Sequence, residues 1–134
     1  MSERKPHILV VDDEPNVLVT YRLILQQQGY TVSAAISSEE ARNVLQKDGV
    51  DLLLCDLSLE KQQSGFDVIH FGRSRNPELH CVLLTGYASV EANERAEQEK
   101  IPVLFKPIDI QQLLQVISDL LRKNDESRQA QHGS

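Results

Sequence analysis

Val10-Val11-Asp12-Asp13-Glu14-Pro15 is the stretch that decides the fold, because a short apolar run ends there in acidic residues. Three further apolar runs also end in a polar residue. The four runs are Ile8–Val11 before Asp12 and Asp13, Leu52–Cys55 before Asp56, Val82–Leu84 before Thr85, and Val103–Phe105 before Lys106. Such short branched runs are typical of strands buried on both faces of a parallel sheet. We therefore expect the polar ends to gather at the carboxyl edge of the sheet, where open α/β folds bind ligands.

Helical patterns separate these runs. They cover Glu14–Gln28, Ser37–Gln46, Ser64 or Gly65 to Ser74, Ser89–Glu99, and a last helix that starts at Ile110. Tyr30–Ala35 alternates weakly and predicts one more strand. Strands that alternate with helices through short connections favour right-handed crossovers and a sheet with helices on both faces. We predict an α/β fold, a doubly wound five-stranded parallel sheet in the flavodoxin-like order 2-1-3-4-5.

The last two helices differ in apolar content. The last helix has Asp109 as a plausible N-cap and an apolar stripe at helical period, formed by Ile110, Leu113, Leu114, Ile117, Leu120 and Leu121. The helix at Ser89–Glu99 has only Val90, Ala92 and Ala96 as apolar residues. It can bury little surface, so we expect it to be held weakly.

Length and composition indicate one globular domain. The chain has 134 residues, of which 40% are hydrophobic and 25% charged, which is ordinary for a soluble domain. We place the domain at residues 6–123. Residues 124–134 are polar and lack a hydrophobic period, so we expect a disordered tail, a linker or an appended end there.

Charge and cysteine content exclude several functions. The net charge of −6 argues against a surface for direct nucleic-acid binding, which needs clustered Lys and Arg. The N-terminus has no signal-peptide pattern, and no apolar run approaches the ~20 residues that span a bilayer, so we expect a cytoplasmic protein without membrane contact. Cys55 and Cys81 are expected to be small buried residues beyond disulfide reach.

The spacing of the polar strand ends suggests shared chemistry. Asp13, Asp56, Thr85 and Lys106 follow one another at intervals of 43, 29 and 21 residues, each about one strand, one helix and a return. Taken alone, an Asp pair after a strand is usually a turn and a helix cap. Together, three carboxylates, a hydroxyl and an ammonium at one edge suit a divalent metal and a phosphoryl group.

These residues closely resemble the receiver domain of bacterial two-component response regulators, from about Pro6 to Lys123. The match is carried by Val10-Val11-Asp12-Asp13-Glu14-Pro15, Leu54-Cys55-Asp56-Leu57, Leu83-Leu84-Thr85-Gly86-Tyr87-Ala88 and Phe105-Lys106-Pro107. The resemblance implies that Asp56 accepts a phosphoryl group from a sensor histidine kinase or a histidine phosphotransfer protein. It also implies Mg²⁺, or Mn²⁺, held by Asp13, Asp56 and the backbone carbonyl of Ser58, with Asp12 acting through water.

The resemblance further implies a conformational switch. Thr85 would donate a hydrogen bond to the bound phosphoryl group and draw its loop inward, Lys106 would neutralise phosphoryl oxygens, and the bond to Pro107 would be cis. The protein would assist its own phosphorylation and dephosphorylation without turning over a separate substrate. Its output would pass to a downstream protein or to an effector domain outside this chain, and a homodimer could form on phosphorylation.

Two features depart from the family pattern. Val103 stands where receivers commonly carry an aromatic residue that reports the movement of the threonine. We hypothesise that Tyr87 takes part in sensing instead, and we count Ser58, Tyr87 and Val103 as positions that tune the switch. The loop over residues 57–65 is about one residue longer than usual and lacks the usual proline.

Other functions remain as alternatives. A haloacid dehalogenase-type hydrolase would need an acid two residues after its nucleophile, which Asp12 and Glu14 imitate poorly. A flavodoxin-like flavin binder would need a hydroxyl-rich phosphate loop after the first strand, where Asp12-Asp13-Glu14 would repel phosphate. The main alternative is a receiver-like interaction module that no longer takes phosphate.

Overall fold

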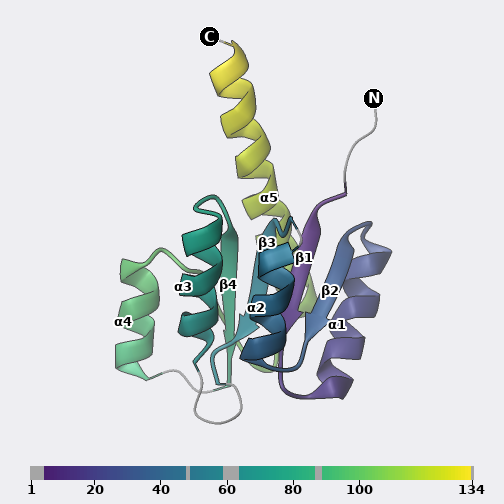
Figure 1. Cartoon of the computed structure of the whole chain (residues 1–134), viewed down its shortest axis with the longest axis vertical. Coiled ribbons are helices and arrows are strands. Elements are labelled where there is room, and N and C mark those ends of the chain that lie inside the picture. The colour runs from purple at the N-terminus through teal and green to yellow at the C-terminus, as the bar shows by residue number, and fades with distance from the viewer. Residues whose placement is uncertain (1–4, 48, 59–63, 87–88, 134) are drawn as a thin grey trace.

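A computed structural model describes residues 5–47, 49–58, 64–86 and 89–133, with side chains to residue 122. Strands and helices alternate five times: β1 (His7–Val11), α1 (Pro15–Gln27), β2 (Thr31–Ala35), α2 (Ser38–Lys47), β3 (Leu52–Asp56), α3 (Gly65–Arg75), β4 (His80–Thr85), α4 (Val90–Gln98), β5 (Val103–Phe105) and α5 (Ile110–Gly133). All paired strands are parallel, in the order β2-β1-β3-β4-β5 (Figure 1). The predicted fold and strand order are confirmed.

The core has two halves because alternate residues of each strand face opposite sides of the sheet. One half joins α1 and α5 to the sheet, through Leu18 and Leu25 from α1 and Leu113 and Ile117 from α5. The other half joins α2, α3 and α4, through a set that includes Leu45, Phe66, Ile69 and Ala96. Since strand residues such as Leu53 and Leu54 are fully buried, the uniformly apolar runs are explained by helices on both faces.

Local signals place several helix ends where the sequence predicts them. Gly29 follows α1 with φ of +94°, a conformation that costs glycine little. Ser37 Oγ accepts a hydrogen bond from Glu40 N (3.1 Å) at the start of α2, while the Glu40 carboxylate accepts from Ile36 N rather than from Ser37 N. Asp109 Oδ1 accepts from the backbone N–H groups of the first turn of α5. These caps satisfy amide groups that a helix start leaves without partners.

The polar ends of β3 and β4 lie at the same edge of the sheet but are offset by one residue. Asp56 lies opposite Leu84, so Thr85 extends one residue further along the edge. Cys81 is paired with Leu53, so Cys55 lies two residues further along β3 than the partner of Cys81. Both cysteines are buried and free, as predicted. His80 is the first residue of β4.

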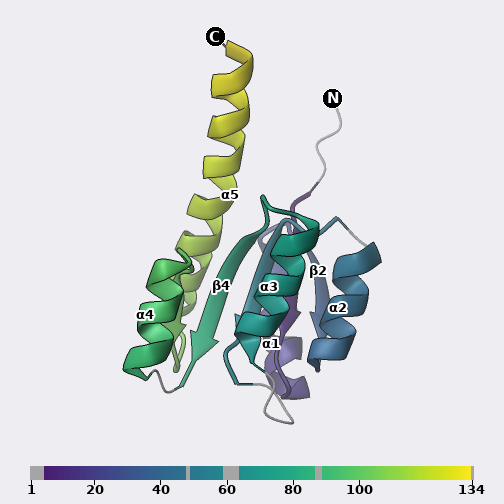
Figure 2. The same ribbon diagram turned by 60° about the vertical axis from the view of Figure 1, so that its left-hand side comes forward.

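The end of α5 differs from a disordered tail, one of the forms expected for residues 124–134; a linker or an appended end stays a prediction. The helix continues to Gly133 and extends away from the body of the molecule, as Figures 1 and 2 show. Residues 124–132 contain no Gly or Pro, and adding a residue to an existing helix is far easier than starting one. The boundary at residue 123 stays a prediction. Over the described residues, no helix has both the length and the apolar content to span a bilayer.

Candidate functional site

Three carboxylates meet at the carboxyl edge of the sheet. Asp12 and Asp13 directly follow β1, and Asp56 is the last residue of β3, the strand that pairs with β1. Each offers an oxygen within 4.8 Å of the others. Asp12 and Asp56 are buried, with only 1% and 6% of their surface exposed. Their placement follows from two adjacent parallel strands ending together.

Lys106 brings a positive charge to this acidic cluster of Asp12, Asp13 and Asp56. Its ammonium nitrogen lies 2.7 Å from Asp56 Oδ2 and 3.6 Å from Asp12 Oδ2. Lys106 N donates to the carbonyl of Thr85 (2.8 Å), which continues the β4–β5 pairing by one residue. The peptide bond to Pro107 is cis, in agreement with the resemblance.

The site shifts the proton affinity of both Asp12 and Lys106. Burial raises the pKa of Asp12 above its ordinary value; the Glu14 N–H and Lys106 oppose this rise, and the charge of Asp56 adds to it. Burial alone would lower the pKa of Lys106, but the hydrogen bond and charge of Asp56, helped by Asp12, raise it overall. The ammonium therefore stays charged at neutral pH, held by carboxylates that repel one another.

The donor set fits a hard divalent cation. Among the described residues, Asp12 Oδ2 is a buried oxygen that accepts no hydrogen bond, although Lys106 lies near it. A buried carboxylate oxygen without a hydrogen bond carries a free-energy cost of desolvation, and a cation in contact with the oxygen offsets this cost. Carboxylate oxygens are the protein ligands that Mg²⁺ prefers. Asp12, Asp13 and Asp56 are thus the described residues that could hold such an ion.

The remaining predicted residues lie around this cluster or outside the described ranges. Thr85 is 3% exposed at the end of β4, and Ser58 N donates to Asp56 Oδ1 (3.1 Å). Val103, at the start of β5, is partly buried and lines a small niche together with Thr85 and with Ala92 of α4. Tyr87 and residues 59–63 of the longer loop lie outside the described residues. The carbonyl of Ser58 as a metal ligand stays a prediction.

Two residues near the site were not singled out from the sequence. A Cβ atom at Gly65 would collide with the carbonyl oxygen of Asp56, so the returning loop approaches the end of β3 where only glycine fits. Tyr21 of α1 is 7% exposed; burial raises its pKa, and the charges of Lys106, Asp12 and Asp56 act on it. Gly65 could have been noticed as the glycine that opens a helix, whereas nothing local places Tyr21 near Lys106.

Comparison with known proteins gives one family. The family model for the response regulator receiver domain matches residues 8–118. The chain is 32% identical over 125 residues to the transcriptional regulatory protein GlrR of Escherichia coli, covering 92% of this chain and 28% of GlrR. It is 30% identical over 126 residues to the regulatory protein TorR of the same species, covering 93% of this chain and 54% of TorR. The chain therefore spans between about a quarter and a half of such relatives.

Solved structures agree with the sequence relatives. A CheY-like receiver domain protein from Methanospirillum hungatei superposes with a TM-score of 0.87 at 25% identity, over 92% of this chain and 99% of that one. The signal receiver domain of an HD domain-containing protein from Pseudomonas fluorescens gives a TM-score of 0.85 at 27% identity, over 92% and 99%. Both likenesses extend over almost the whole of the described fold.

Proposed function

Because the chain belongs to the family of response regulator receiver domains, we propose that it is a two-component switch in which Asp56 is the phosphoacceptor. The observation that carries the proposal is the pairing of Asp56 with Lys106 at 2.7 Å inside the acidic cluster. Asp56 ends a buried strand that pairs with β1 on one side and with β4 on the other, so its backbone is held in place. A rigidly placed carboxylate beside a cation suits phosphoryl transfer, which depends on alignment and charge stabilisation.

The transfer step follows from this geometry. A carboxylate oxygen of Asp56 attacks the phosphorus of a phosphohistidine, a new P–O bond forms, and the P–N bond breaks. The electron pair goes to the imidazole nitrogen of the donor, which takes up a proton. The Lys106 ammonium stabilises the negative charge that moves with the phosphoryl oxygens. Hydrolysis of the resulting aspartyl phosphate would reset the switch, so the chain consumes no separate substrate.

Asp12 and Asp13 complete the site. When bound by Asp12, Asp13 and Asp56, Mg²⁺ or Mn²⁺ would neutralise carboxylate and phosphoryl charge. Asp12 is fixed for this role by the hydrogen bond from Glu14 N to its Oδ1 (2.9 Å), which leaves Oδ2 available. The carbonyl of Ser58 is proposed as a further ligand because Ser58 N already contacts Asp56 Oδ1.

Thr85 is proposed to read the phosphoryl state. It ends β4 beside the acidic cluster, and Lys106 N is hydrogen-bonded to its carbonyl. A hydroxyl drawn toward the phosphoryl group would shift the segment that leads to α4, which biases a two-state equilibrium. Val103 cannot act as an aromatic reporter, so movement of Thr85 would reach α4 through the niche that these two residues share with Ala92.

Partners and output follow the family. A sensor histidine kinase or a histidine phosphotransfer protein would supply the phosphoryl group, and a downstream protein or an effector domain would receive the signal. Val90 and Phe105 are 73% and 54% exposed, and such apolar surface on α4 and β5 would suit a homodimer formed on phosphorylation. The cytoplasmic location and the absence of nucleic-acid contact stay predictions.

Intact mass after incubation with acetyl phosphate tests the proposal. The wild-type chain with Mg²⁺ should gain one phosphoryl group, and it should gain none in EDTA. Asp56→Asn should abolish the gain, whereas Asp67→Asn, a change at an exposed residue of α3, should leave it intact. If the wild-type chain binds Mg²⁺ but gains no mass, the phosphate-independent interaction module would be the better account.

A further inference from the structure

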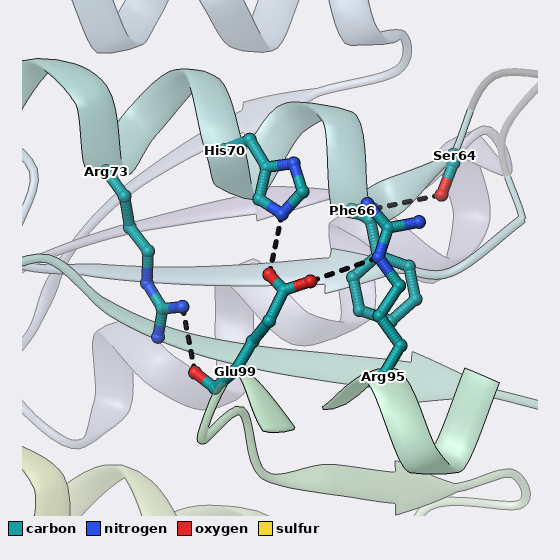
Figure 3. Close-up of polar contacts among 6 residues, drawn as sticks. All are labelled: Ser64, Phe66, His70, Arg73, Arg95 and Glu99. Carbon is teal, nitrogen blue, oxygen red and sulfur yellow. Dashed lines mark hydrogen bonds and ion pairs between the residues drawn. The ribbon is translucent and has the colours of Figure 1, made fainter. Parts of the chain in front are cut away.

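One stripe of α3 contacts the last turn of α4 through polar and aromatic groups. Phe66, His70 and Arg73 follow one another at helical spacing, so they share a face of α3. All three contact Arg95 or Glu99 at the end of α4, as Figure 3 shows. We call the five residues the Glu99 clamp.

Glu99 is the centre of the clamp. His70 Nε2 lies 2.6 Å from its Oε1, and Arg95 Nε donates to its Oε2 (3.0 Å), so each carboxylate oxygen has one partner. Arg73 donates to the backbone carbonyl of Glu99 (3.0 Å), one of the groups that a helix end leaves without a partner. Desolvation would raise the pKa of Glu99, but the bonds from His70 and Arg95 hold it below its ordinary value. The carboxylate is therefore charged at neutral pH.

Arg95 links the clamp to Phe66, a buried residue of α3. Its guanidinium carbon lies 4.2 Å above the centre of the Phe66 ring, within the range of a cation–π contact. Phe66 itself is 3% exposed, so this contact ends on a fixed part of the core. The Arg95–Glu99 pair is also at i, i+4 spacing on α4, which holds the two side chains in one arrangement.

The clamp matters because α4 buries so little apolar surface. Ala96 is the one residue of α4 that is buried, Ala92 is partly buried and Val90 is 73% exposed. Exposed ion pairs usually contribute little to stability, and His70 and Arg95 are nearly half exposed. On a helix with so few apolar contacts, even a modest polar contribution decides where the helix rests.

The other end of α4 lies at the switch. Ala92 and Asn93 line the niche that also includes Thr85 and Val103. The same short helix therefore contacts Thr85 near its start and α3 at its end. We propose that Glu99 is a positioning residue, which holds α4 on α3 in the resting state so that release of the clamp favours the phosphorylated state. The second half of this inference rests on the proposed function.

Glu99→Gln tests the inference, with Glu97→Gln as its control. The first substitution keeps size and removes the charge that His70 and Arg95 share, while Glu97 is exposed on the same helix. Amide hydrogen exchange of α4 in the unphosphorylated protein should become about three- to tenfold faster in Glu99→Gln, the range expected for loss of one charge-assisted hydrogen bond between partly exposed groups. Glu97→Gln should not change it.

Binding of beryllium fluoride with Mg²⁺, a mimic of the phosphoryl group, measures the coupling. By linkage, Glu99→Gln should bind it about three- to tenfold more tightly than wild type. In the double variant Glu99→Gln with His70→Gln, the change in binding free energy should be smaller than the sum of the changes in the two single variants, because both substitutions remove the same interaction.

The outcomes separate the two claims. Unchanged exchange in α4 would show that Glu99 does not position the helix. Faster exchange with unchanged beryllium fluoride affinity would overturn the link to the switch. If the wild-type chain bound no beryllium fluoride, the proposed function would fail, while the exchange measurement would still decide whether Glu99 holds α4.

Discussion

The helices α4 and α5 flank the same short strand but are held in different ways. The α5 helix buries Leu113 and Ile117 completely in the half of the core that it shares with α1. The α4 helix buries Ala96 and partly buries Ala92, and its polar contacts include the Glu99 clamp and Ser89, whose hydroxyl caps its start. Moving α5 would expose buried apolar surface to water, which costs much free energy. The few polar contacts of α4 can be broken at modest cost.

This difference shows how a small domain can move one helix without unfolding. The strands that carry Asp56 and Thr85 are fixed by a core that α5 helps to close. A helix whose position depends on a few directional contacts can shift while that core stays intact. Substitutions in these two helices and at the acidic cluster should therefore differ in the size and sign of their effect on stability.

Truncating the apolar side chains of the two helices should have the largest and most unequal effects. Leu113→Ala should lower the free energy of unfolding by about 3 kcal/mol, because it leaves a cavity at a fully buried position of α5. Val90→Ala, at an exposed position of α4, should change it by less than about 0.5 kcal/mol. Urea denaturation measures both. Equal losses would contradict the claim that apolar burial holds α5 far more strongly than α4.

Neutralising a carboxylate of the acidic cluster should increase the stability of the fold, whereas truncating Leu113 should decrease it. Asp12→Asn should raise the free energy of unfolding in EDTA by about 1 kcal/mol, because it removes a buried charge whose Oδ2 accepts no hydrogen bond within the described part of the chain. It should also weaken Mg²⁺ binding. A loss of stability would show that the ion pair with Lys106 outweighs the desolvation of Asp12.

The pH dependence of this gain gives an independent check. The folded-state pKa of Asp12 is raised above its ordinary 3.8 by burial, so the folded protein binds this proton more tightly than the unfolded chain. The contribution of Asp12 to stability is therefore most favourable below 3.8 and falls as pH rises through the raised folded-state pKa. The advantage of Asp12→Asn should grow over the same interval and then level off.

The smallest effect is expected at the end of α4. Lys100 has φ of +59°, a left-handed conformation that costs a lysine more than a glycine. Lys100→Gly should raise stability by about 0.5 kcal/mol, whereas Glu97→Gly, inside the helix, should lower it by about 1 kcal/mol. Thermal or urea unfolding would detect the opposite signs. A loss in both variants would mean that the backbone at Lys100 is not strained.

Local patterns made most of the fold predictable. The apolar runs, Pro15 with Gly29 around α1, and Asp109 before α5 are short-range signals, and each lies where the sequence indicates. The gathering of Asp12, Asp13, Asp56 and Lys106 also follows from strand ends in a parallel sheet. The cis bond before Pro107 was predicted from the family resemblance, since most bonds before proline are trans.

The features that sequence analysis missed depend on contacts between distant segments. The one-residue offset of Thr85 from Asp56 is set by how β3 and β4 pack, and no turn or cap in the sequence encodes it. His70 and Glu99 are 29 positions apart, so no local pattern predicts their contact. Only the i, i+4 spacing of Arg95 and Glu99 could have suggested part of the clamp.

Amide hydrogen exchange of the wild-type chain, with and without beryllium fluoride and Mg²⁺, tests the central claim most directly. We predict that the amides of α4 exchange through a local opening whose free energy is well below that of global unfolding. Binding of the phosphoryl mimic should change the protection of these amides against exchange. Amides near Leu113 and Ile117 should exchange only through global unfolding and should be unaffected by any local shift. Equal protection of α4 and α5, unchanged by the mimic, would contradict the account.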